Sequence, residues 1–170
     1  MQGLKIIGLG SALPGKRVHN DDLAKIMETS DEWIFSRTGI HERRFCEKEE
    51  SAGTLAIEAG KKALEEAGVP ASDLGVILVA SMSPDFSSPS IAAILAKELA
   101  TAEDCIALDI NAACSGFVYG LEVVRGLLAF SRKKRALVVG TEQLSRLLKM
   151  EELHGYTVLF PSANRPVRST

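Results

Sequence analysis

Apolar runs that alternate with amphipathic stretches constrain the fold of this chain more than any other feature. The runs at 76–80, 106–113 and 136–139 are almost continuously apolar, as expected of strands covered on both faces. The stretch Thr54–Ala67 places apolar residues at every fourth position and is followed by Gly68, which predicts an amphipathic helix with a glycine stop. Strand–helix–strand repetition predicts an α/β fold with a mostly parallel sheet and helices on its faces.

Shorter elements complete this pattern. We expect a strand at Leu4–Leu9, a helix from Asn20 as N-cap through Glu28, a helix capped by Ser30-Asp31-Glu32 that stops before Gly39, a helix from Ser88-Pro89 to about Leu99, and a last strand at Thr157–Phe160. No linker divides residues 1–160, so we expect one domain there. Residues 161–170 contain two prolines and two arginines without apolar periodicity, which predicts a disordered tail.

The composition indicates a soluble protein and argues against several other classes. The chain has 170 residues, 46% of them hydrophobic, and a formal net charge of −2. This balance lacks the basic excess of a nucleic-acid binder, and we expect neither a signal peptide nor a membrane-spanning run. The three cysteines are odd in number and form no Cys-x-x-Cys motif, so we expect no disulfide framework, no metal site and a cytoplasmic location.

Cys114 is the candidate nucleophile. It separates the strand-like run 106–113 from the helix-like run 115–124, so it should lie at the N-terminus of a helix. The unpaired N–H groups of a helix N-terminus favour a thiolate, the reactive form of cysteine. The small residues around Cys114 leave room for a substrate carbonyl. On residue type alone, a buried structural cysteine is the alternative, and Cys46 and Cys105 fit that alternative better.

Trp33 and Arg37 form a candidate binding pair. They are four residues apart on one predicted helix and therefore share a face. An indole and a guanidinium can hold a flat aromatic ring by stacking and cation–π attraction. The alternative is a surface tryptophan covered by the stem of an arginine. Gly8-x-Gly10 lacks the third small residue of a dinucleotide fingerprint, since Leu13 stands there, so we expect only a turn.

Four stretches read together resemble β-ketoacyl-acyl carrier protein synthase III, the initiating condensing enzyme of bacterial fatty acid synthesis. They are Ile6–Pro14, Thr29–Ile34 with Arg37–Ile40, Asn111–Phe117 and Ala136–Gly140. The Thr-Ser-Asp-Glu-Trp and Ala-Cys-Ser-Gly-Phe stretches are the most specific. The resemblance covers residues 1 to about 160 and implies the N-terminal half of the duplicated, layered α/β/α/β/α fold of thiolase-like enzymes.

The resemblance also implies roles for individual residues. Cys114 would take an acyl group from acyl-CoA, Trp33 and Arg37 would hold the adenine of coenzyme A, and Thr29 would lie beside that site. Condensation with malonyl-acyl carrier protein would follow, in a homodimer and without a further cofactor. The family's additional adenine-stacking arginine has no match near His154.

The resemblance ends where the family continues into a glycine-rich stretch, because Pro161-Ser162-Ala163-Asn164 stands there instead. The family's catalytic histidine and asparagine have no match in this chain. We therefore expect an incomplete enzyme that does not condense at a useful rate alone, and an apolar face left uncovered. Two alternatives stay open: a non-catalytic acyl-CoA or carrier-protein binding fragment, and a polyketide-type relative from secondary metabolism.

Overall fold

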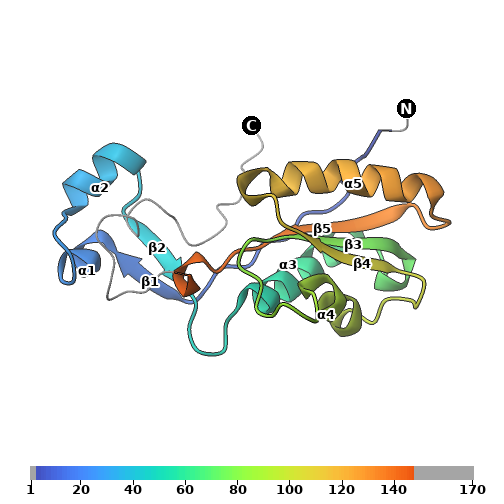
Figure 1. Cartoon of the computed structure of the whole chain (residues 1–170), viewed down its shortest axis with the longest axis horizontal. Helices are drawn as coiled ribbons and strands as arrows, with labels where there is room; N and C mark the ends of the chain where they lie inside the picture. Colours follow the sequence, from blue (N-terminus) through green and yellow to red (C-terminus); the bar gives the residue numbers. More distant parts are fainter. Residues whose placement is uncertain (1–2, 148–170) are drawn as a thin grey trace. The chain divides into compact units, whose positions relative to one another are not determined.

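The computed structural model describes residues 3–147 (Figure 1). Two compact units make up this part of the chain. Unit 1 contains residues 3–12 and 52–141, and unit 2 contains residues 13–51 and 142–147. The predictions for 157–160, for the tail 161–170 and for the surroundings of His154 lie outside the described residues. The proposed domain over 1–160 therefore stays a prediction.

Unit 1 is a parallel sheet with helices on both faces. Its elements in chain order are α3 (Ala52–Ala67), β3 (Leu74–Ala80), α4 (Ile91–Glu98), β4 (Ile106–Ile110), α5 (Gly116–Phe130) and β5 (Arg135–Gly140). The strand order is β4-β3-β5, and both neighbours run parallel to β3. In Figure 1, α5 covers one face of the sheet, and α3 and α4 cover the other. The predicted parallel α/β architecture is confirmed.

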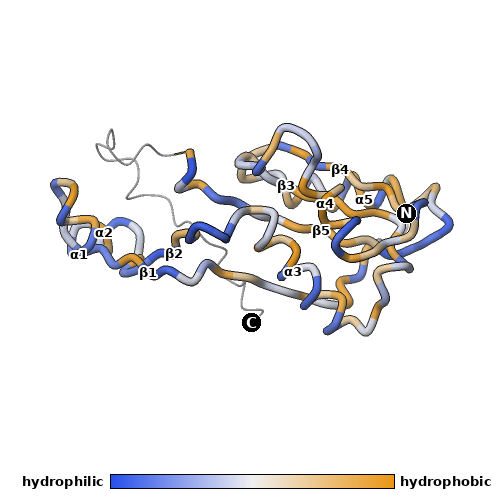
Figure 2. Tube along the Cα trace, turned by 90° about the horizontal axis from the view of Figure 1, so that it is seen from below, coloured by the Kyte–Doolittle hydropathy of each residue, from blue (hydrophilic) through white to orange (hydrophobic). Residues whose placement is uncertain are grey.

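The central strand β3 shows why this sheet forms. All seven of its residues are buried, as expected for a strand with both faces covered. Because side chains alternate along a strand, Ile77 and Val79 pack towards α3 and α4, whereas Val76 and Leu78 pack towards α5. Figure 2 shows the same hydrophobic character along β3 and β5.

Unit 2 contains a two-stranded antiparallel sheet and two short helices. They are β1 (Lys16–His19), α1 (Asn20–Ala24), α2 (Asp31–Thr38) and β2 (Glu42–Phe45). The prediction for α2 is confirmed: Ser30 is the N-cap and accepts from the backbone N–H of Trp33, and Gly39 ends the helix with φ of 66°. The pairing of β1 with β2 was not expected from the sequence.

Three sequence-based boundaries are wrong. The α1 helix ends at Ala24, its N-cap is His19, and the side chain of Asn20 is buried instead of capping. The α4 helix begins at Ile91 after the N-cap Ser90, two residues later than the start predicted at Ser88-Pro89. Residues 4–9 form no strand.

The N-terminal segment lies along α3 instead of pairing with a strand of the described sheet. A Cβ atom on Gly8 would lie 2.4 Å from the carbonyl oxygen of Ala63, and one on Gly10 would lie 2.1 Å from that of Ala59. The two glycines therefore allow the backbone to touch the alanine stripe of α3. They are neither a dinucleotide loop nor the turn that we expected.

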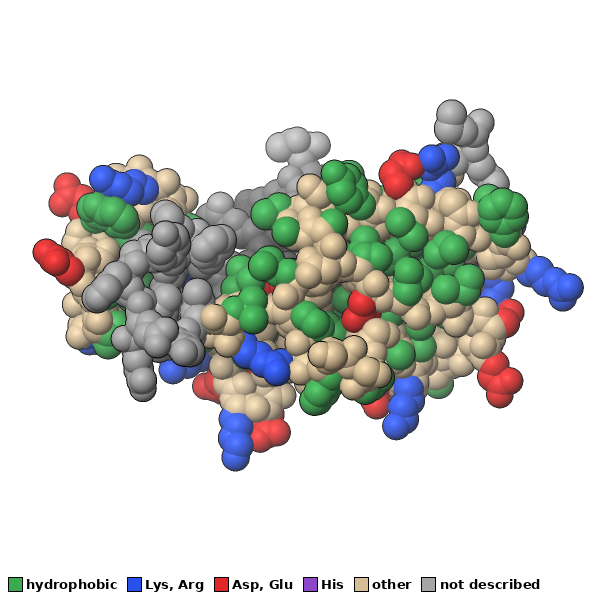
Figure 3. All heavy atoms as spheres, in the orientation of Figure 1, with side chains coloured by type: hydrophobic (Ala, Val, Ile, Leu, Met, Phe, Trp, Pro, Cys, Tyr) green, Lys and Arg blue, Asp and Glu red, His purple; other side chains and the backbone are tan. Residues whose placement is uncertain are grey.

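The helix α5 has a second, uncovered apolar side. Gly116, Gly120 and Val124 are buried against the sheet, whereas Val118 and Tyr119 are exposed by 60% and 57%. Figure 3 shows hydrophobic side chains on the face of unit 1 that carries this helix. The uncovered apolar face expected from half of a larger fold is thus present.

One described helical stretch, Ala113–Phe130, is long and apolar enough to cross a membrane by length and composition. The expectation of no such run is therefore wrong in this respect. The stretch packs on β3 and β5 and carries the ion pair of Glu122 with Arg125. Packing on the sheet explains the apolar character of its buried side, formed by Gly116, Gly120 and Val124.

Candidate active site

The carboxyl ends of three parallel strands meet at one edge of the sheet in unit 1. Beyond the strand ends, the Ser81 N–H donates to the Ile110 carbonyl at 3.1 Å, and the Thr141 N–H donates to the Ala80 carbonyl at 3.2 Å. These bonds tie the loops after β3, β4 and β5 together. In open α/β sheets, ligand sites form at this edge.

Cys114 lies at this edge, in the turn between β4 and α5. Residues Ala113–Ser115 form a single 3₁₀ turn, and α5 begins at Gly116 immediately afterwards. The side chain of Cys114 is exposed. The predicted place of the candidate nucleophile, at a strand-to-helix turn and a helix N-terminus, is what the structure shows.

The backbone before the thiol is strained. Ala113 has φ of 45°, in the left-handed region that costs a residue with a Cβ atom about 1–2 kcal/mol. The side chain of Asn111 accepts a hydrogen bond from the Ala113 N–H at 3.3 Å, which supports this conformation. The next residue, Cys114, is exposed in this turn. The left-handed conformation of Ala113 was not predicted from the sequence.

Two glycines set the distance between α5 and the sheet. A Cβ atom on Gly116 would lie 3.1 Å from the Cβ of Ala80, and one on Gly120 would lie 2.7 Å from a methyl group of Leu78. Because they are four residues apart, both face the strands. This close approach fixes the first turn of α5, and hence Cys114, relative to the edge of the sheet.

Asp109 organises a second helix end at the same sheet. Its carboxylate accepts from the N–H groups of Ile91 and Ala92, at 2.7 and 2.8 Å, in the first turn of α4. A carboxylate at a helix N-terminus is favourable because it meets unpaired donors and the positive end of the helix dipole. Asp109 was not among the residues predicted from the sequence, although a carboxylate within an apolar strand is an unusual feature.

The other two cysteines differ from Cys114 in their surroundings. Cys46 and Cys105 are both half-buried. Burial raises the pKa of the Cys105 thiol. Cys114 thus has the most exposed of the three thiols and is the only one at the start of a described helix.

Trp33 and Arg37 lie on α2 of unit 2 and contact each other. The guanidinium carbon of Arg37 lies 4.2 Å from the centre of the Trp33 ring, a cation–π geometry. The Arg37 side chain also donates to the Trp33 carbonyl at 3.3 Å. One face of the indole is thus covered by the guanidinium, and a planar ligand would stack on the other face or displace the arginine.

Thr29 precedes the N-cap of α2. Its hydroxyl is buried and has no hydrogen-bond partner among the described residues. An unpartnered buried hydroxyl is costly unless another group meets it. Thr29, Trp33 and Arg37 belong to unit 2 and Cys114 belongs to unit 1, so the structure describes them as two separate sets.

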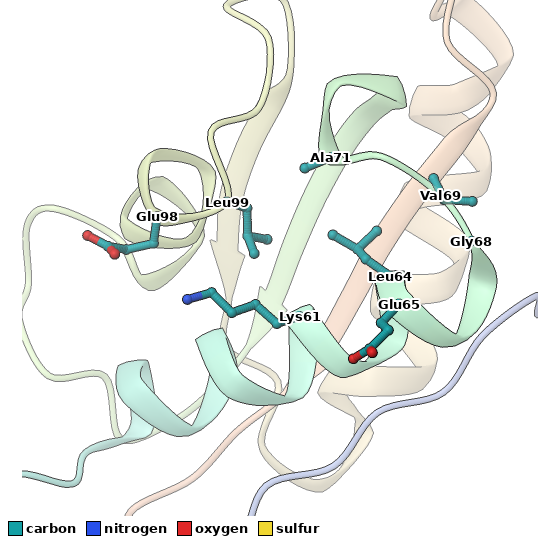
Figure 4. A pocket seen from close by; sticks show the side chains of 8 residues that line it. All are labelled: Lys61, Leu64, Glu65, Gly68, Val69, Ala71, Glu98 and Leu99. Carbon is teal, nitrogen blue, oxygen red and sulfur yellow. The ribbon is translucent and has the colours of Figure 1, made fainter.

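A pocket in the described part of the chain contains none of these residues. It has a volume of about 440 Å³ and lies between α3 and the end of α4 (Figure 4). Leu64 and Leu99 contribute apolar surface, and Lys61, Glu65 and Glu98 contribute charge. Because it lies where the strands begin, it is at the opposite edge of the sheet from Cys114. Residues 3–147 also contain no cluster of side chains suited to hold a metal ion.

Comparisons with known proteins identify the relatives of this chain. Residues 108–163 match the family model of 3-oxoacyl-[acyl-carrier-protein] synthase III. A β-ketoacyl-[acyl-carrier-protein] synthase III of Clostridium perfringens is 46% identical over 160 residues, which cover 94% of this chain and 48% of that protein. One of Rhizorhabdus wittichii is 43% identical over 89% of this chain and 47% of that protein.

Solved structures show the same relationship. The synthase III of Aquifex aeolicus superposes with a TM-score of 0.85 and 41% identity, covering 94% of this chain and 51% of that one. The priming β-ketosynthase of the R1128 polyketide pathway superposes with a TM-score of 0.82 and 28% identity, covering 93% of this chain and 47% of that one. The chain spans about half the length of the curated relatives that it matches. Over 94% of its length the chain is therefore similar in sequence to about half of a β-ketoacyl-[acyl-carrier-protein] synthase III, and it shares the thiolase-like fold of these enzymes.

Proposed function

We propose that this chain is an acyltransferase of the synthase III type, in which Cys114 accepts an acyl group from acyl-CoA. The thiolate sulfur attacks the thioester carbonyl, the new carbon–sulfur bond forms, and coenzyme A leaves as a thiolate that takes a proton from solvent. The observation that carries the proposal is the exposed Cys114 side chain at the N-terminus of α5. The helix dipole there favours both the attacking anion and the negative charge that develops on the carbonyl oxygen.

The stacked pair on α2 supports binding of coenzyme A. Its adenine is a flat aromatic ring, and the exposed indole of Trp33 together with Arg37 offers a surface for stacking. Thr29 lies just before the N-cap of the same helix, and its buried hydroxyl has no hydrogen-bond partner among the described residues. We infer that these three residues bind the nucleotide and that Cys114 receives the acyl group.

The acyl-enzyme would then condense with malonyl-acyl carrier protein in a cytoplasmic homodimer. Decarboxylation of the malonyl group needs donors that stabilise an enolate. The two histidines of the described part are engaged elsewhere: His19 faces Glu42 at 3.8 Å, and His41 bonds to Asp31 at 2.9 Å. We therefore assign acyl transfer to the described residues and expect condensation to need groups beyond them.

Acylation of the purified protein tests this function. After incubation with acetyl-CoA, mass spectrometry should find one acetyl group on Cys114, and Cys114→Ala should abolish it. The double variant Cys46→Ala/Cys105→Ala is the matched control and should acylate at the wild-type rate. Equal acylation of all three cysteines, or acylation of Cys114→Ala, would refute the proposal.

A non-catalytic acyl-CoA binder is the second candidate, favoured by the stacked pair of Trp33 and Arg37, which forms without any contribution from Cys114. Trp33 is the sole tryptophan, so its fluorescence reports binding directly. A fluorescence change with coenzyme A in the absence of any acylation of Cys114 would identify a binder. The likeness to the R1128 priming synthase keeps a polyketide-type acyl substrate within the same proposal.

A further inference from the structure

The helix that carries Trp33 and Arg37 needs support from outside itself. It has eight residues, and only Ile34 is fully buried. Helices this short are marginal in water because nucleation is costly and few internal hydrogen bonds follow. The geometry of the stacked pair therefore depends on whatever holds the two ends of α2.

Asn20 contacts both ends of α2. Its side-chain amide donates to the carboxylate of Asp31, the first residue of the helix, at 2.8 Å. The same amide donates to the carbonyl of Ile40, just beyond the Gly39 cap, at 2.7 Å. The backbone N–H of Asn20 donates to the carbonyl of His41 at 3.1 Å. Only 1% of Asn20 is exposed, so water does not compete for these bonds.

Arg43 fixes the orientation of the Asn20 amide. Its guanidinium donates to the Asn20 side-chain oxygen at 2.8 Å. A guanidinium has no acceptor, so the oxygen of Asn20 must face Arg43 and the NH₂ group must face Asp31 and Ile40. Only 3% of Arg43 is exposed, and two of its nitrogens, Nε and Nη1, have no hydrogen-bond partner among the described residues. The hydrogen bond to Asn20 is therefore its main polar contact in the described part of unit 2.

We propose that Asn20 is a positioning residue, which holds both ends of α2 and thereby fixes Trp33 and Arg37 for stacking on a planar ligand. The choice of coenzyme A as that ligand rests on the proposed function. The positioning itself rests on the hydrogen bonds of Asn20 and is open to measurement without any ligand.

Asn20→Asp is the sharpest test, because it keeps the size of the side chain and the contact with Arg43. It removes both N–H donors and places a carboxylate against the carboxylate of Asp31. If α2 then adopts its ligand-competent geometry in about a tenth of the molecules, the Kd for coenzyme A rises about tenfold. In the ligand-free protein, acrylamide should quench Trp33 faster than in wild type.

Asp31→Ala is the second variant, because Asp31 lies at the surface and its loss spares the core. It removes one of the two hydrogen bonds donated by the Asn20 amide, together with the bond between Asp31 and His41, so quenching and Kd should change in the same direction but less, about threefold. Val18→Ala is the matched control: it weakens the small core of unit 2 without touching the hydrogen bonds of Asn20. It should lower Tm but leave Trp33 quenching and the Kd at their wild-type values well below Tm.

The outcomes separate this proposal from the proposed function. Wild-type quenching and Kd in both Asn20→Asp and Asp31→Ala would overturn the positioning role. Equal effects of Val18→Ala and Asn20→Asp at matched distance from Tm would also overturn it, because they indicate general destabilisation. If the wild-type protein does not respond to coenzyme A, the proposed function fails, and ligand-free quenching still decides the role of Asn20. If Asn20→Asp does not fold, Asp31→Ala decides it.

Discussion

Replacing Gly120 with alanine tests how closely α5 packs on the sheet. The added methyl group would lie 2.7 Å from a methyl carbon of Leu78, well inside the roughly 3.5–4.0 Å of an unstrained carbon contact. Leu78 is fully buried, and side chains of Val138 and Ile110 lie 3.5 and 3.6 Å from the same point. There is little room for Leu78 to move, so the helix itself must shift.

Two opposing terms set the size of the effect. Alanine improves the intrinsic stability of a helix interior over glycine by about 0.5–1 kcal/mol. Overpacking of a filled core costs about 1–3 kcal/mol. We therefore expect Gly120→Ala to lower the free energy of unfolding by roughly 0.5–2 kcal/mol.

Gly126→Ala is the matched control, because it changes the same residue type in the same helix. Apart from the neighbouring backbone of α5 itself, no atom of residues 3–147 lies within 4 Å of the position of its added methyl group. Only the helix term then applies, and unfolding should become harder by about 0.5–1 kcal/mol. Urea unfolding followed by circular dichroism measures both variants. Equal effects in sign and size would show that α5 does not meet the sheet at Gly120, and the placement of Cys114 would lose its basis.

Three further predictions concern single groups. Iodoacetamide should alkylate Cys114 before Cys105, because Cys105 is half-buried and burial raises the pKa of its thiol; peptide mass mapping checks the order. The hydrogen bond from His41 is the largest of the contacts that lower the pKa of Asp31 below its ordinary value of 3.8. The stability that ionised Asp31 contributes is therefore present above pH 3.8 and is lost as the pH falls through the pKa of the folded state. Unfolding measured from pH 6 to pH 2 should therefore show a weaker acid dependence in Asp31→Asn, and an unchanged dependence would refute this. Asp109→Ala should lower the free energy of unfolding by about 1–2 kcal/mol, because two backbone N–H groups at the start of α4 lose their acceptor. An unchanged free energy of unfolding would contradict this.

The sequence predicted best where local chemistry and burial agree. The helix α2 begins after Ser30 and ends at Gly39 because a hydroxyl N-cap and a left-handed glycine act within a few residues. The strand β3 was recognisable because burial on both faces requires a continuous apolar run. The turn at Cys114 was predicted because the strand-like run 106–113 is followed directly by the helix-like run 115–124.

Features that depend on distant parts of the chain were not predicted correctly. Asn20 matches the residue type of an N-cap, but its amide is used by segments 11 and 20 residues further along the chain. Residues 4–9 have the composition of a strand, yet a strand also needs a neighbour, and here the backbone follows α3 at Gly8 and Gly10. Local patterns carry no information about such partners.

The left-handed backbone at Ala113 has a consequence for how this turn tolerates change. A residue held at φ of 45° resists β-branched replacements, whose bulk near the backbone makes that region costly. The exposed side chain at position 114 carries no such restriction. The peptide geometry of Ala113 thus orients its neighbour, so the sulfur of Cys114 can be exchanged for oxygen or hydrogen while the backbone of the turn stays intact.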